Sequence, residues 1–217
     1  MAALTHLPVV LTSSSIDGGR DEEVVEANAA IVNAMQHALL FTNDMSPVAV
    51  RSCSVDFYLG QVLEGGFAQY AATAGGRSGA ADALVRDGMA AMGAAAHLDL
   101  FNRAVEACGT GADHDCVARL AQLDGEFEEL LEHENITALN SGWLLCQPDL
   151  LVLDDEDIGP YIQRAASLLS GLAGRRAAGA GAAASRIAGA LRGSRSGPAI
   201  RNRSGDSGAG KEKPGRP

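Results

Sequence analysis

Two pairs of adjacent glycines, Gly65-Gly66 and Gly75-Gly76, interrupt an otherwise helical stretch that begins near Asp56. Glycine adopts the left-handed backbone conformation without a Cβ clash, so paired glycines commonly end helices. One short apolar turn, Phe67-Ala68-Gln69-Tyr70, lies between the two pairs. The pattern therefore predicts a helix that stops at the first pair, restarts briefly and stops again at the second.

Phe67 and Tyr70 are three residues apart and so lie on one face of the short helical segment. Because large aromatic side chains bury well, we predict a helix–turn–helix corner whose rings lie in the core. The alternative is a ligand pocket for a small molecule or peptide near Gln69 and Tyr70. A well-formed cavity lined by residues 65–70 would favour that alternative.

Apolar residues recur at helical spacing along most of the chain. They predict a compact all-α domain of about six to seven helices over residues 21–171. The expected helices span residues 21–41, 47–64, 78–95, 98–108, 113–133 and, from an Asp154 or Asp155 cap, a final segment to about 169. The apolar runs 143–146 and 150–153, split by Pro148, are expected to be short strands or extended segments. Ser and Gly breakers predict that residues 1–20 form a loosely ordered N-terminal extension.

The charges divide the chain into an acidic part and a basic part. Residues 1–171 hold seven Arg and no Lys against 25 Asp and Glu, a formal charge of −18. Residues 172–217 hold eight Arg and two Lys against one Asp and one Glu, a charge of +8. The second part is rich in Gly, Ala, Ser and Arg, and it has too little apolar surface to offset ordering entropy, so we predict a disordered tail. The tail could be inert, fold back on the acidic domain, or contact nucleic acid weakly.

The sequence contains no recognisable constellation for catalysis, and we expect neither an enzyme nor a cofactor. His133-Glu134-Asn135-Ile136-Thr137 lacks the second histidine of a zinc-binding H-E-x-x-H motif. Adjacent residues of Asp113-His114-Asp115-Cys116 point in different directions on a helix, so this run predicts a helix start and no metal site. There is neither a long apolar run nor a basic signal segment. We therefore expect a cytoplasmic protein with reduced cysteines and no membrane contact.

Carboxylates on the helix through Phe127 are the remaining candidates for a functional surface. At 100° per residue the apolar side chains gather around Phe127, while most carboxylates lie on the other side. One interpretation is a solvated face that only keeps the protein soluble. The functional interpretation is a negative surface that attracts a basic protein. The candidate partner-binding residues are Asp124, Glu126, Glu128, Glu129, Glu132, Glu134, Asp154, Asp155, Glu156 and Asp157.

Residues 58–70, Y-L-G-Q-V-L-E-G-G-F-A-Q-Y, resemble the signature of the small all-α domain family named for DNA-mimic proteins. The typical family pattern is N-G-G-F-x-Q-Y, and Glu64 stands here where the family usually has Asn. The matching residues are Gly65, Gly66, Phe67, Gln69 and Tyr70. The segment Leu123-Asp124-Gly125-Glu126-Phe127 is similar to the family's L-D-x-x-F/Y segment. The resemblance covers roughly residues 21–171.

This resemblance implies an all-α protein that imitates nucleic acid. Such a protein would occupy the nucleic-acid-binding surface of a basic partner, such as a transcriptional regulator. Direct binding of nucleic acid by the folded domain is not expected, because a charge of −18 repels phosphates. Assembly as a homodimer is left open.

Overall fold

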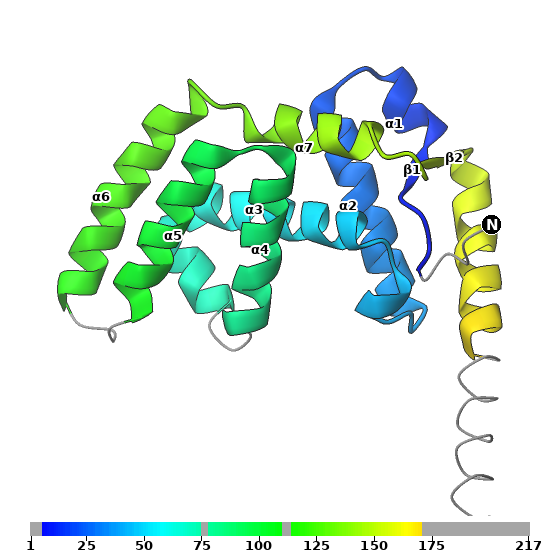
Figure 1. Ribbon diagram of the computed structural model, residues 1–217, viewed down its shortest axis with the longest axis horizontal. Coiled ribbons are helices and arrows are strands. Elements are labelled where there is room, and N and C mark those ends of the chain that lie inside the picture. The colour runs from blue at the N-terminus through cyan, green and yellow to red at the C-terminus, as the bar shows by residue number, and fades with distance from the viewer. Residues whose placement is uncertain (1–5, 75–77, 110–113, 171–217) are drawn as a thin grey trace, which may run out of the picture. The chain divides into compact units, whose positions relative to one another are not determined.

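The computed structural model describes residues 6–74, 78–109 and 114–170. The chain divides after Gly171 into two units, and the described residues all belong to the first. Almost all secondary structure in that part of the chain is helical, which confirms the predicted all-α class (Figure 1). Gly75-Gly76 and the predicted disordered tail at 172–217 lie outside the described residues.

The helices alternate with short turns, and two very short strands lie near the two ends of the described chain (Figure 1). A further helix, without a label in the figure, spans residues 155–170. The elements are β1 (Val10–Thr12), α1 (Ser13–Asp17), α2 (Asp21–His37), η1 (Thr42–Asp44), α3 (Pro47–Ala74), α4 (Ser78–Met92), α5 (Ala95–Gly109), α6 (His114–Leu131), α7 (Ile136–Leu145) and β2 (Leu151–Leu153).

The N-terminal segment is ordered into the fold, so the prediction of a loose extension over residues 1–20 is wrong for residues 6–20. β1 pairs in parallel with β2, with Val10 opposite Leu151 and Leu11 opposite Val152. Val9, Val10 and Leu11 are at most 1% exposed. The burial of three consecutive apolar side chains outweighs the Ser and Gly breakers that follow them. The run 150–153 does contain a strand, whereas residues 143–145 belong to α7.

The buried side chains form two hydrophobic clusters, and α3 contributes to both. One cluster joins the first turns of α3 to β1, α2 and the helix 155–170. The other joins the later part of α3 to α4, α5 and α6. In Figure 1, α3 accordingly crosses between α5 and α6 on one side and α2, β1 and β2 on the other.

Buried polar side chains link α2, α3 and α7. Asn28 on α2 donates through Nδ2 to the Ala49 carbonyl at 3.0 Å and to Ser52 Oγ at 3.1 Å, both on α3. Asn140 on α7 donates to the Ser52 carbonyl at 3.3 Å. Because all of these groups are buried, the hydrogen bonds favour one relative arrangement of the three helices.

The predicted break at the first glycine pair is present as a kink inside α3. Gly65 and Gly66 both have non-helical backbone angles, and Gly66 has φ +70°. A Cβ at Gly66 would lie 2.5 Å from Asp124 Oδ2, a carboxylate of α6. A residue at this position must adopt the left-handed conformation and must have no Cβ, and only glycine meets both requirements.

We predict that Gly66→Ala destabilises the domain by about 2–3 kcal/mol, through the left-handed backbone and the displaced Asp124 carboxylate. Equilibrium urea unfolding followed by circular dichroism measures this effect. Gly60→Ala is the matched control, since Gly60 is an exposed helical residue of α3 with no atom within 4 Å of an added Cβ. The control should gain about 0.5–1 kcal/mol. Equal effects of the two substitutions would contradict the assigned role of Gly66.

Candidate functional site

Asp124 on α6 is half-buried against the kink of α3. Its Oδ1 accepts a hydrogen bond from the backbone N–H of Phe67 at 2.7 Å. Phe67 is the first residue after the glycine pair, where the helix restarts and its first N–H groups have no partner within the helix. Asp124 thus acts as an N-cap for the restarting helix, although it belongs to another helix, α6. This contact uses one of the two oxygens of its carboxylate.

Glu134 also caps a helix. Its carboxylate accepts from the backbone N–H of His97 at 3.0 Å and of Ala96 at 3.4 Å, in the first turn of α5. His97 is fully buried, and its Nε2 donates to the Glu134 carbonyl at 3.1 Å. The His97 ring meets the Phe127 ring edge to face at a centroid distance of 5.7 Å. The loop after α6 is therefore fastened to the start of α5.

The pKa of His97 lies below its ordinary value because burial disfavours the imidazolium, although Glu134 opposes part of this shift. His97 Nδ1 is buried with no hydrogen-bond partner among the described residues. A second proton on the ring would therefore have no acceptor in the fold. Neutral His97, protonated on Nε2, is the form that this site stabilises.

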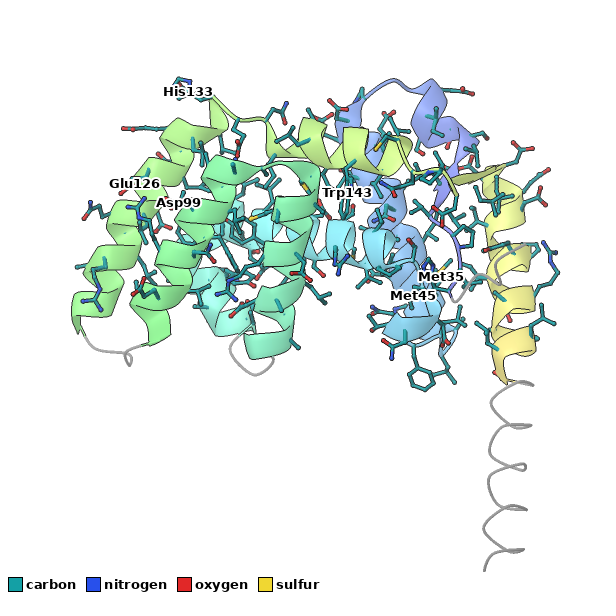
Figure 2. All side chains as sticks on the ribbon, viewed as in Figure 1. Met35, Met45, Asp99, Glu126, His133 and Trp143 are labelled. Atoms are coloured by element: carbon teal, nitrogen blue, oxygen red, sulfur yellow. The ribbon has the colours of Figure 1, made fainter. Side chains whose placement is uncertain are left out.

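Glu126 pairs with Arg103 on the neighbouring helix α5. The guanidinium binds both carboxylate oxygens, at 2.7 and 2.8 Å, and it also lies 3.8 Å from Asp99. Figure 2 labels Asp99 and Glu126, which lie on the neighbouring helices α5 and α6. The hydrogen bond from Arg103 lowers the pKa of the Glu126 carboxyl below its ordinary value. The Asp99–Arg103 pair has i, i+4 spacing and could have been found from the sequence, whereas the Arg103–Glu126 pair joins two helices and could not.

Glu128, Glu129 and Glu132 are exposed, in contrast to the half-buried Asp124, Glu126 and Glu134. None of the three has an ion-pair partner among the described residues. Glu128 and Glu129 lie in the last turn of α6, and Glu132 lies in the turn that follows the helix. We call these three residues the α6 acidic surface.

The second carboxylate group, residues 154–157, is also exposed and lies at the start of the helix 155–170. Asp154 accepts from Ser13 Oγ at 3.0 Å, and Asp155 accepts from Ser14 Oγ at 2.8 Å. Carboxylates in a first helical turn are stabilised by the helix dipole, so this group has a structural role. It adjoins β2, and Figure 1 shows β2 on the far side of α3 from α6. The predicted carboxylates thus form two separate groups.

Phe67 and Tyr70 lie in the core, as the helix–turn–helix interpretation predicts. Phe67 is 2% and Tyr70 is 4% exposed. Their rings pack against Tyr58, at centroid distances of 6.2 and 5.4 Å, and Tyr70 also packs against Phe101 at 5.6 Å. The Tyr70 hydroxyl donates to Asp82 at 2.9 Å, and the half-buried Gln69 side chain packs beside Gly65. The rings of Phe67 and Tyr70 are therefore part of the core.

The described residues contain neither a cluster suited to a metal ion nor a membrane-spanning helix. No group of three or more His, Cys, Asp or Glu side chains there is arranged to hold a metal ion. No helix in the same part of the chain is long and apolar enough to cross a membrane. The side chains of the run 113–116 lie outside the description.

Unfolding at different pH values tests the buried state of His97. Because the folded pKa of His97 lies below the unfolded value of 6.5, the unfolded chain binds more protons as the pH falls through that value. We expect the free energy of unfolding to decrease from pH 7.5 to pH 5. His97→Gln should reduce this decrease, whereas substitution of the exposed His133 by Gln should leave it unchanged. Urea titrations at each pH measure it, and equal pH profiles for the wild type and His97→Gln would contradict the assignment.

Comparison with known proteins identifies the family. Searches of curated proteins and of solved structures gave no match. A family model described as DMP19-like protein matches residues 43–164, which include the glycine kink, the aromatic cluster around Tyr58 and the whole of α6. The match covers more than half of the chain, so this protein belongs to the DMP19-like family of DNA-mimic domains.

Proposed function

We propose that this protein is a non-enzymatic acidic interaction protein that binds a basic protein surface and blocks its nucleic-acid site. A DNA-binding transcriptional regulator is the partner class that fits this proposal. Membership of a family of DNA-mimic domains supports the imitation of nucleic acid. The charge of −18 over residues 1–171, with no lysine, supports a basic partner.

The α6 acidic surface is the observation that carries the proposal. Glu128, Glu129 and Glu132 are exposed without ion-pair partners among the described residues, so their charge is available to another molecule. Proteins that bind nucleic acid present Arg and Lys to a row of phosphates. The same cations form charge-assisted hydrogen bonds with carboxylates. A helix that bears several free carboxylates therefore suits a surface built for phosphates.

The other predicted carboxylates contribute less to this surface. Asp124 and Glu134 cap helices, and Glu126 is neutralised by Arg103. The group 154–157 is exposed but separate from α6. We therefore narrow the proposed partner-binding set to the α6 acidic surface and treat residues 154–157 as a comparison group.

Two variants, each with three substitutions, distinguish a role in partner binding from a role in solubility. Each variant loses three negative charges, so the two differ only in where the charges are lost. Glu128→Gln, Glu129→Gln and Glu132→Gln together neutralise the α6 acidic surface. Asp155→Asn, Glu156→Gln and Asp157→Asn together neutralise the comparison group and retain Asp154. If each exposed pair contributes up to about 0.5 kcal/mol, the α6 triple variant should bind about tenfold more weakly.

The measurement starts with a basic DNA-binding protein captured by the full-length chain at low salt and then purified. Fluorescence anisotropy with labelled duplex DNA shows whether this chain displaces the DNA from the captured protein. We expect displacement that weakens as salt is added, because screening reduces the attraction. We expect the α6 triple variant to displace DNA poorly and the comparison variant to act nearly as the wild type. Simultaneous binding of DNA and this chain, or equal losses in the two variants, would refute the proposal.

A further inference from the structure

Arg103 lies beside the α6 acidic surface and holds a carboxylate next to it. Its Nη1 and Nη2 donate to the two carboxylate oxygens of Glu126 at 2.7 and 2.8 Å, and Nη1 lies 3.8 Å from Asp99. Glu126 and Glu129 are three residues apart on α6, so their side chains are neighbours on the helix surface. The Arg103 pair is therefore continuous with the α6 acidic surface.

Asp99 and Glu126 together form a binding position for a guanidinium group. Asp99 on α5 and Glu126 on α6 approach the same group from two helices. The two parallel hydrogen bonds to Glu126 have the fork geometry that arginine also uses on phosphate. Proteins that bind nucleic acid present such arginines to the phosphate row. Arg103 therefore occupies the position that suits an arginine of the proposed partner class.

This position is open to another molecule. The side chains of Arg103, Glu126 and Asp99 are 44%, 36% and 75% exposed. An exposed ion pair contributes little to stability, because solvent screens the charges and two long side chains lose conformational freedom. If a second guanidinium replaces Arg103 on Glu126, one exposed pair is exchanged for another of the same chemistry. The fold therefore loses little when Arg103 turns away into water.

We propose that Arg103 is an internal competitor, which occupies the guanidinium position formed by Asp99 and Glu126. When a basic partner binds, one of the partner's arginines displaces Arg103 and pairs with Glu126. Before that exchange Arg103 neutralises a carboxylate beside the binding surface and so lowers the affinity for basic proteins. This inference rests on the function proposed for the α6 acidic surface, and it adds a position for arginine and a limit on affinity.

Short basic peptides test the inference without an identified partner. The full-length chain is titrated into labelled hexa-arginine or hexalysine, and fluorescence anisotropy is measured at several salt concentrations. Arg103→Gln removes the competitor and keeps a good helix former. We expect it to bind hexa-arginine about threefold more tightly, with a steeper loss of affinity as salt is added. The gain for hexalysine should be smaller, because an ammonium group cannot form the two-bond fork.

Two further variants separate this exchange from a change in net charge. Arg20→Gln is the matched control, because Arg20 forms an exposed pair with Glu23 at the start of α2, across α3 from α6 (Figure 1). It loses the same charge and should bind hexa-arginine nearly as the wild type does. In a Glu126→Gln background, Arg103→Gln should give a smaller gain, since the carboxylate that it frees is absent.

Three results would overturn the inference. They are no gain from Arg103→Gln, an equal gain from Arg20→Gln, and an undiminished gain in the Glu126→Gln background. Displacement of DNA from the captured basic protein tests the proposed function separately. If the wild type displaces DNA but Arg103→Gln gains nothing, the competitor role fails alone. If the wild type does not displace DNA but Arg103→Gln still gains affinity for hexa-arginine, the proposed function fails and the guanidinium position stands.

Discussion

The hydrogen bond from the Phe67 backbone to the Asp124 carboxylate, at 2.7 Å, is the contact on which the arrangement of one half of the domain depends. It forms because the Gly65-Gly66 break exposes the backbone N–H of a restarting helix, and α6 provides a carboxylate at that point. The restarted segment then carries Phe67 and Tyr70 into the aromatic cluster with Tyr58 and Phe101. The glycine pair therefore determines both the direction of α3 and the packing of α6.

Once α6 is fixed in this way, its carboxylates divide according to their orientation. Asp124 faces α3, and Glu126 reaches Arg103 on α5, while Glu128 and Glu129 remain exposed. Glu134, just beyond the helix, turns inward to cap α5. The same helix thus stabilises the fold through one set of acidic side chains and presents another set to solvent. This division explains how a helix rich in carboxylates can belong to a stable core and still offer a negative surface.

The contact of α3 with α4 beside Arg51 depends on a different glycine and a different pair of helices. Gly88 brings α4 close to α3, and the Arg51–Asp87 pair lies at their contact. Nothing in the local sequence separates this arginine from the other arginines of the acidic domain. Its pairing with Asp87 comes from the close packing of the two helices.

The sequence by itself determined the all-α class, the break at Gly65-Gly66 and the core position of Phe67 and Tyr70, because backbone freedom and helical periodicity are local properties. It also determined the charge of each part of the chain. Only the tertiary structure decided that residues 9–11 are buried, since their partner strand lies about 140 residues away. Tertiary structure also decided which carboxylates remain free, because Asp124, Glu126 and Glu134 bind groups on other helices that no sequence spacing connects to them.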